Sequence, residues 1–267
     1  MDKIAIIGSG NIGFSLARGL VQRGGMQPEH ITLTRRNVGA LTEAVPEGFQ
    51  VTGDNVEAVR SSSIVVLAIL PQQLAQVLDE LAPVIGQVRP LVVSVVSGAS
   101  CGDIRTRLGE GVEIVRAMPN TAIAIGESMT CVATDVASNE SVARVERLFE
   151  SVGEVISIHE DLMTSATALC ACGIAFFLRG IRAASQGGVE IGFHAHDALK
   201  MAVQTAKGAA DLLSKMQTHP EGEIDKVTSP KGCTIAGLNE MEHHGFSSAF
   251  IKGIKLSALK ADGLYQG

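Results

Sequence analysis

Three glycines directly after a short apolar run constrain this chain more than any other feature of its sequence. Residues 4–7, IAII, form the apolar run, which predicts a strand buried on both faces. Gly8, Gly10 and Gly13 follow with the spacing G-x-G-x-x-G, and apolar residues then recur at helical spacing over residues 14–20. Strand, glycine turn and helix in this order are typical of a Rossmann unit, whose turn binds the pyrophosphate of a dinucleotide. The alternative is a glycine-rich turn that binds no ligand.

The end of the next predicted strand, residues 31–33, indicates which dinucleotide the turn binds. A Rossmann protein that uses NAD usually has Asp or Glu there for the ribose 2′-hydroxyl, whereas this chain has Thr34, Arg35 and Arg36. Two arginines and a hydroxyl suit a 2′-phosphate, and a hydrogen bond to a charged group contributes about 1.5–3 kcal/mol. We therefore expect NADPH as cofactor, with weaker binding of NADH; two solvated arginines are the alternative. The expected cofactor-binding residues up to this point are Gly8, Ser9, Gly10, Asn11, Ile12, Gly13, Thr34, Arg35 and Arg36.

Strands and helices alternate through residues 1–158, which predicts an α/β fold with a Rossmann-type, doubly wound, mostly parallel sheet. Further strands are expected at residues 49–51, 64–70, 91–96, 112–116, 129–133 and 155–158. Helices are expected at residues 38–45, 54–60 with Asp54 as cap, 72–81 opened by Pro71, 103–108 and 139–152. Ligands in such sheets bind at the carboxyl ends of the strands, so residues there should lie near the nicotinamide. These residues are Leu70, Pro71, Ser97, Gly98 and Asn120.

Near residue 160 the pattern changes from alternating strands and helices to helices alone. We therefore expect a dinucleotide-binding domain at residues 1–158 and a helical domain at residues 159–267. The expected helices are residues 163–184, 197–216, 234–244 and 247–261, with a turn at 224–227 and a loop at 228–232. Gly187 and Gly188 are expected to end the first of these helices. The uncharged run at residues 162–178 is marginal for a bilayer and favours a buried or interface helix.

Composition and charge exclude several classes of function. The net charge of −6 argues against a nucleic-acid or anionic-membrane surface, so local groups must hold any anionic ligand. The five cysteines have neither a disulfide-framework nor a zinc spacing, and the N-terminus enters a strand without a signal peptide. Both observations indicate a cytoplasmic protein with reduced thiols. His194 and His196 have no third ligand at a suitable spacing, so no metal site is expected.

The loop at residues 227–238, VTSPKGCTIAGL, is the most specific motif of the second half. Its Ser-Pro-x-Gly sequence allows a sharp bend just before a helix begins. Free N–H groups at such a helix start can bind a carboxylate without a cationic side chain. Thr234 adds a hydroxyl at the same place.

The chain resembles the pyrroline-5-carboxylate reductase family over its whole length. Residues 229–246 are similar to the family signature S-P-G-G-T-T-I-A-G-L-x-x-L-E-x-x-G-F. The glycine turn, the segment at residues 70–72, the Met-Pro-Asn-Thr turn at residues 118–121 and the total length also fit. The resemblance implies NADPH-dependent reduction of the cyclic imine 1-pyrroline-5-carboxylate to L-proline, the last step of proline biosynthesis. It also implies a homodimer with interleaved helical domains, often assembled further into a ring.

The resemblance implies roles for individual residues of the helical domain, which would carry substrate binding and dimerisation. In the family, the loop matching residues 229–234 grips the substrate carboxylate, and the hydroxyl matching Thr234 lies near the imine nitrogen. Thr234 is therefore the expected catalytic residue, and the proton for the nitrogen would come from solvent. The expected substrate-binding residues are Ser229, Lys231, Gly232, Cys233 and Thr234.

Four departures from the family pattern lie around the expected substrate pocket. Leu70 replaces a usual lysine, Lys231 replaces the first glycine of S-P-G-G, and Cys233 replaces the first threonine. Residues 170–176, CACGIAF, stand where the family has S-G-S-G-P-A-Y. Reduction of another small cyclic imine is therefore an alternative activity.

Two further alternatives stay open. A β-hydroxyacid dehydrogenase-like enzyme would use a helical lysine with asparagine four residues on, but Lys207 is followed by Asp211. A nucleotide-binding regulatory protein without catalysis is the non-enzymatic alternative.

Overall fold

The computed structural model describes residues 2–265, which divide into two compact units. The first unit is Met1–Cys172 together with Leu256–Gly267, and the second unit is Gly173–Lys255. Residues 1 and 266–267, the outer limits of the predicted domains, lie outside the described residues. The two units are defined by packing and not by function. The predicted functional domains, 1–158 and 159–267, therefore stay a prediction.

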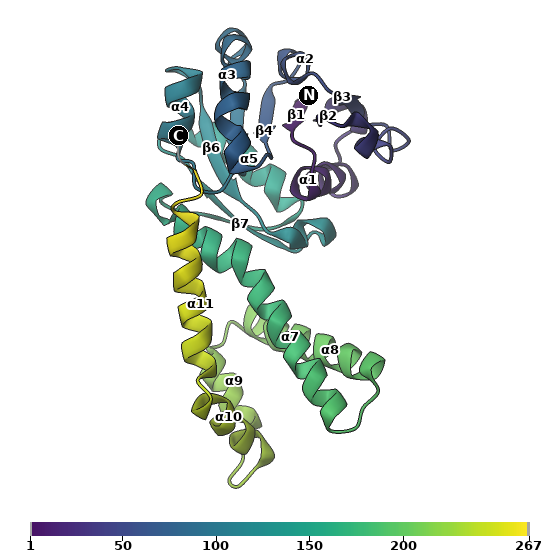
Figure 1. Cartoon of the computed structure of the whole chain (residues 1–267), viewed down its shortest axis with the longest axis vertical. Coiled ribbons are helices and arrows are strands. Elements are labelled where there is room, and N and C mark those ends of the chain that lie inside the picture. Colours follow the sequence, from purple (N-terminus) through teal and green to yellow (C-terminus); the bar gives the residue numbers. More distant parts are fainter. Residues whose placement is uncertain (1, 266–267) are drawn as a thin grey trace. The chain divides into compact units, whose positions relative to one another are not determined.

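The first unit contains one sheet, which in the described residues has eight strands in the order β3-β2-β1-β4-β5-β6-β7-β8. Figure 1 labels β1 to β4, β6 and β7 of this sheet. All neighbouring strands are parallel except β6 and β7, which are antiparallel. The first six strands have the Rossmann order 3-2-1-4-5-6, so the predicted doubly wound, mostly parallel sheet is confirmed. The strands are β1 (Ile4–Ile7), β2 (Ile31–Thr34), β3 (Gln50–Thr52), β4 (Ile64–Leu67), β5 (Leu91–Ser94), β6 (Ile114–Met118), β7 (Ser128–Ala133) and β8 (Gly153–Ser157).

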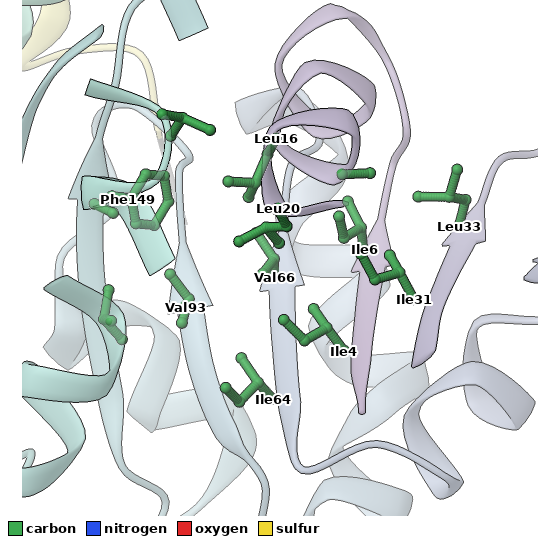
Figure 2. Close-up of a cluster of buried hydrophobic side chains, with 14 of the residues drawn as sticks. Ile4, Ile6, Leu16, Leu20, Ile31, Leu33, Ile64, Val66, Val93 and Phe149 are labelled. Atoms are coloured by element: carbon green, nitrogen blue, oxygen red, sulfur yellow. The ribbon is translucent and has the colours of Figure 1, made fainter. Parts of the chain in front are cut away.

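Helices cover both faces of this sheet. They are α1 (Asn11–Gln22), α2 (Asn55–Arg60), α3 (Pro71–Val88), α4 (Cys101–Leu108) and α5 (Asn139–Glu150). Side chains alternate along β1, so Ile4 and Ile6 pack with α1 and α5, whereas Ala5 and Ile7 pack with α2, α3 and α4. Figure 2 shows the first of these clusters, with Leu16 of α1 close to the strands. Burial on both faces explains why the β1 sequence is continuously apolar.

Local sequence signals place several helix and strand ends. Asp54 Oδ1 accepts a hydrogen bond from the Glu57 N–H at 3.0 Å, which confirms the predicted cap of α2. Pro71 is the first residue of α3, also as predicted. The strand predicted at residues 64–70 is shorter, because β4 ends at Leu67, level with its partners in β1 and β5. The helix predicted at residues 38–45 is only a 3₁₀ turn, Val38–Leu41.

The second unit consists of helices. They are α7 (Gly173–Glu190), α8 (Ala195–Met216), α9 (Pro220–Val227), α10 (Cys233–His243) and α11 (Phe246–Ala261), whose residues from Leu256 belong to the first unit. The prediction that Gly187 and Gly188 end a helix is wrong, because α7 continues to Glu190. A Cβ on Gly188 would lie 3.0 Å from the Ala198 Cβ, so this glycine lets α8 approach α7 closely. The turn predicted at residues 224–227 is the end of α9, which Pro220 opens.

The helix predicted at residues 163–184 is interrupted. A short helix α6 (Met163–Ala166) is followed by one π-helical segment, η5 (Thr167–Cys172), before α7 begins. The Thr167 hydroxyl donates to the Met163 carbonyl at 2.9 Å and so binds an acceptor of the preceding turn. Among the described residues, the helical stretch Glu160–Glu190 has the length and apolar composition that a membrane-crossing helix needs.

Candidate functional site

The glycine turn lies between the carboxyl end of β1 and the start of α1, and its geometry requires glycine at two positions. Gly8 has φ +91°, and a Cβ there would lie 2.4 Å from the Ile69 side chain and 2.6 Å from the Ala68 carbonyl oxygen. A Cβ on Gly13 would lie 2.8 Å from the Gly8 carbonyl oxygen. A Cβ on Gly10 would meet nothing within 4 Å, so the backbone at Gly10 is open to a ligand.

The start of α1 offers free backbone donors. Gly10 precedes the helix and makes no side-chain capping bond, and the first turn carries no acidic residue. The N–H groups of this turn and the positive end of the helix dipole therefore suit an anion. A cavity of about 370 Å³ opens beside them, lined in part by Ser9, Gly10, Asn11, Ile12 and Arg35. The residues present fit the pyrophosphate of a dinucleotide.

The three residues predicted for the 2′-phosphate have different surroundings. Arg35 is exposed and lines the same cavity as the glycine turn. Arg36 is also exposed, and its Nη2 donates to Gln76 Oε1 of α3 at 3.5 Å. Thr34 is only 1% exposed. Its hydroxyl donates to Asn55 Oδ1 at 2.7 Å and accepts from the Gly8 N–H at 3.4 Å.

Asn55 was not predicted to belong to the cofactor region. It is the first residue of α2, just after β3, and its Nδ2 donates to Glu80 Oε2 at 3.4 Å. The signal that could have identified it is its place at the carboxyl end of a strand next to β2, since such ends lie together.

Asn120 lies at the carboxyl end of β6 and is held by hydrogen bonds of its N–H and its side chain. Its N–H donates to Ser128 Oγ at 3.0 Å, and its Oδ1 accepts from the Ala122 N–H at 3.0 Å. Its Nδ2 donates to the Cys170 carbonyl in the π-helical segment at 3.3 Å. Asn120 is therefore fixed in position, with an 8% exposed side chain at the strand end predicted for the nicotinamide.

The strand ends at β5 and β4 carry the remaining predicted cofactor residues. Ser97 Oγ donates to Met118 Sδ at 3.8 Å. Gly98 has φ +86°, and a Cβ there would lie 3.0 Å from the Tyr265 backbone nitrogen and 3.1 Å from the Ala261 carbonyl oxygen. The end of the chain therefore packs over Gly98. Leu70 is 64% exposed just before Pro71 at the start of α3.

The five predicted substrate residues lie together in the second unit, at the start of α10. Gly232 precedes this helix, and its N–H donates to the Ser229 carbonyl at 2.9 Å. A Cβ on Gly232 would lie 2.5 Å from Ser229 Oγ, so the bend needs glycine there. Lys231 has φ +61°, a left-handed conformation that is costly for a residue other than glycine. Cys233 and Thr234 form the first turn of α10.

One further cluster has metal-ligating residue types. Cys101 Sγ and carboxylate oxygens of Asp135 and Glu160 all lie within 4.8 Å of one another. Arginines bind both carboxylates, since Arg105 lies 2.7 Å from Asp135 and Arg116 lies 3.3 Å from Glu160. Burial raises the pKa of the Cys101 thiol to about 12, so the thiolate that a metal needs is disfavoured. These groups fit an ion-pair cluster better than a metal site.

The doubly wound sheet, the open glycine turn and the arginine in its cavity define a Rossmann-type, dinucleotide-dependent oxidoreductase. Two family models match the chain: NADP oxidoreductase coenzyme F420-dependent over residues 3–98, and pyrroline-5-carboxylate reductase dimerisation over residues 160–264. The second match supports homo-oligomerisation.

Two named relatives establish the family of this chain. The chain is 49% identical to pyrroline-5-carboxylate reductase 1 of Dictyostelium discoideum over 98% of its own length, although it spans only 50% of that relative. It is 47% identical to pyrroline-5-carboxylate reductase 2 of the same organism, covering 97% of this chain and 91% of the relative. The chain belongs to the pyrroline-5-carboxylate reductase family, which confirms the resemblance found in the sequence.

A solved structure supports the fold. The crystal structure of Plasmodium falciparum pyrroline carboxylate reductase with NADP bound superposes with a TM-score of 0.89, at 24% identity, covering 99% of this chain and 98% of that one.

Proposed function

We propose that this chain reduces 1-pyrroline-5-carboxylate to L-proline with NADPH, the last step of proline biosynthesis, and uses NADH less well. The observation that carries the proposal is the open glycine turn with Arg35 in its cavity, in a chain 47% identical to a named reductase over 91% of that relative. When bound, NADPH supplies the hydride for the C=N bond.

The cofactor would be held by residues of the first unit. The free N–H groups at residues 11–13, in the first turn of α1, bind the pyrophosphate, and Arg35 and Arg36 pair with the 2′-phosphate. The buried Thr34 hydroxyl braces the turn instead of contacting the phosphate, because Asn55 and the Gly8 N–H already bind it. Ser97, Gly98, Asn120, Leu70 and Pro71 place the nicotinamide.

The substrate would be held by the start of α10. Free N–H groups at residues 233 and 234, in the first turn of α10, bind the carboxylate, while the bend at Ser229 and Gly232 positions them. Thr234 hydrogen-bonds at the imine nitrogen, and solvent supplies the proton that makes the carbon a better hydride acceptor.

Lys231 favours a second candidate, the reduction of another small cyclic imine carboxylate. It adds a cation to the carboxylate loop, at a position whose left-handed backbone would suit glycine better. A dehydrogenase like the β-hydroxyacid enzymes gains no such support, since Lys207 Nζ lies 2.9 Å from Asp211 Oδ2 in an ion pair.

We also propose that the helices of the second unit pair in a homodimer or a larger homo-oligomer. Phe177, Leu178, Leu199 and Leu212 are each 46–62% exposed in the single chain, and a second copy would cover such apolar side chains. The assembly would be cytoplasmic and would bind neither membrane nor nucleic acid.

The test is NADPH oxidation by the purified protein with 1-pyrroline-5-carboxylate, compared with piperideine-carboxylates as substrates and with NADH as cofactor. The proposal expects the highest kcat/KM for 1-pyrroline-5-carboxylate with NADPH. A piperideine-carboxylate as the better substrate would establish the second candidate. Tight NADPH binding without turnover of any cyclic imine would instead make the chain a regulatory protein, and oxidation of 3-hydroxy acids with NADP⁺ would make it a dehydrogenase.

A further inference from the structure

Two thiols face each other in the first unit, and neither has a role in the proposed reaction. Cys131 Sγ of β7 lies 3.8 Å from Cys170 Sγ of the π-helical segment η5. The two residues are 39 positions apart in the sequence, and both are reduced. Cys131 is 4% exposed, whereas Cys170 is half-buried. Cys170 is therefore the more exposed residue of the pair.

The thiols also differ in ionisation. One S–H can donate to the other sulfur across this contact, and the contact lowers the pKa of Cys170 and raises the pKa of Cys131. A free cysteine titrates near 8.5, and the thiolate is the form that reacts with oxidants. Cys170 is thus the more readily ionised thiol and belongs to the more exposed residue of the pair.

The pair belongs to a small apolar cluster between the sheet and η5. Cys131, Met118 and Met163 are buried in it, and Cys170 packs against it. The same residue is joined to the strand end of β6, because the Cys170 carbonyl accepts from Asn120 Nδ2. A covalent change at Cys170 would therefore alter a residue whose carbonyl is hydrogen-bonded to Asn120.

We propose that Cys131 and Cys170 form an oxidative modification site that hydrogen peroxide converts into an intrachain disulfide. In the first step the Cys170 thiol releases its proton to solvent, the thiolate attacks one peroxide oxygen, an S–O bond forms, the O–O bond breaks, and the departing hydroxide takes up a proton equivalent to the one released and becomes water. In the second step Cys131 attacks the sulfenic sulfur, the S–S bond forms, and the S–O bond breaks as the hydroxide leaves with the Cys131 proton as water. In sum, two thiols are oxidised and one peroxide is reduced to two waters.

The distance is short enough for this step. A disulfide S–S bond is about 2.05 Å long, so the two sulfurs must approach by about 1.8 Å from their separation of 3.8 Å. Cys131 is fixed in the centre of β7, so Cys170 moves. Its π-helical segment is the element that can adjust, because an inserted π turn can shift by small changes in its hydrogen bonds.

The test treats the full chain with hydrogen peroxide, alkylates the remaining thiols and maps the peptides by mass spectrometry. The expected result is a Cys131–Cys170 cross-linked peptide, with the five free thiols falling by two. Dithiothreitol should restore both thiols. This readout needs no enzymatic activity, so it stands or falls separately from the proposed function.

Variants separate a specific pair from general thiol oxidation. Cys131→Ser should stop the reaction at a sulfenic acid on Cys170, which dimedone traps, and Cys170→Ser should form no cross-link. The matched control is Cys172→Ser, which removes a half-buried cysteine of the same segment and should leave the cross-link unchanged. Oxidation of Cys172 or Cys233 in the wild-type chain while Cys131 and Cys170 stay reduced would overturn the proposal, and this peptide map does not depend on any variant folding.

Discussion

The Thr34 hydroxyl donates to Asn55 Oδ1 at 2.7 Å, and this bond ties the end of β2 to the start of α2 directly beneath the glycine turn. The same hydroxyl accepts from the Gly8 N–H at 3.4 Å, and the Thr34 carbonyl accepts from the Gly8 and Ser9 N–H groups at 3.2 and 2.9 Å, so the glycine turn is held in place by Thr34. Thr34 is buried, and its hydroxyl has no access to bulk water as a substitute partner.

Asn55→Ala should therefore lower the free energy of unfolding by about 1–3 kcal/mol, the usual cost of leaving a buried polar group without its partner. It should also weaken NADPH binding, because the Thr34 side chain that contacts the turn loses its acceptor and is held less firmly. Urea unfolding and isothermal titration measure the two effects. Glu80→Ala is the control, since it removes only the weaker 3.4 Å contact to Asn55; equal losses in both variants would contradict a special role for the Thr34 bond.

Arg35→Ala should weaken NADPH binding by roughly tenfold to a hundredfold and leave NADH binding almost unchanged. The reason is that Arg35 lines the cavity of the turn, and a charged hydrogen bond to a 2′-phosphate contributes about 1.5–3 kcal/mol. Dissociation constants for both cofactors check this. Arg60→Ala removes the same charge from the exposed end of α2, and a comparable effect there would reduce the role of Arg35 to general electrostatics.

Gly8→Ala and Gly10→Ala should affect different properties, the first the free energy of unfolding and the second NADPH binding. Gly8 has a left-handed backbone and no space for a Cβ, so alanine there should destabilise the fold by about 1–3 kcal/mol or more. Gly10 has open space, so alanine should leave the free energy of unfolding nearly unchanged and weaken NADPH binding by obstructing the pyrophosphate. Paired unfolding and binding measurements check both; normal NADPH affinity in Gly10→Ala would show that the ligand does not approach this backbone.

Thr234→Ala should lower kcat or raise KM for 1-pyrroline-5-carboxylate and leave NADPH affinity nearly intact, because Thr234 lies in the substrate loop and not at the glycine turn. Steady-state kinetics and cofactor titration separate these effects. Thr228→Val is the control, since its hydroxyl donates to the Ile224 carbonyl at 2.7 Å within the same region. Unchanged kinetics in Thr234→Ala would remove this residue from the site.

Protonation of Glu113 should lower the free energy of unfolding in acid. Hydrogen bonds from the Ser141 hydroxyl at 2.6 Å and the Ser138 N–H at 2.7 Å lower the pKa of this carboxyl. Its stabilisation is therefore complete above the unfolded pKa of about 4.3 and is lost as pH falls through the lower native value. Urea unfolding from pH 7 to pH ~3 should show a smaller acid loss in Glu113→Gln than in the wild type. The exposed Glu110→Gln serves as the control for loss of a surface carboxylate, and an equal change in both variants would contradict a specific role for Glu113.

The sequence predicted the sheet well because its signals are local. The central strands β1 and β4 are continuous apolar runs, and Asp54 and Pro71 mark helix starts through their own chemistry. The sequence-based predictions are wrong where a residue distant in the sequence determines the local structure. Gly188 looks like a helix end, but it accommodates Ala198 of the next helix, and the π-helical segment depends in part on Asn120, fifty residues earlier.

The candidate site likewise has parts that the sequence predicts and parts that it does not predict. The turn at residues 8–13 and the arginines could be found from spacing alone, whereas the Thr34–Asn55 bond joins residues 21 positions apart with no motif between them. Likewise, neither Cys131 nor Cys170 indicates its partner, because the pairing follows from how η5 packs on β7.

The return of residues 256–265 to the first unit changes how deletion experiments must be designed. Tyr265 packs against the core face formed with α2, α3 and α4, and the neighbouring backbone covers Gly98. A stop codon placed anywhere in α7 to α10 would thus remove residues 256–265 of the first unit together with helices of the second unit. Loss of cofactor affinity in such a truncated protein would say nothing about oligomerisation. An internal excision that rejoins Cys172 to Leu256 through a short linker keeps both halves of the first unit and separates the two questions.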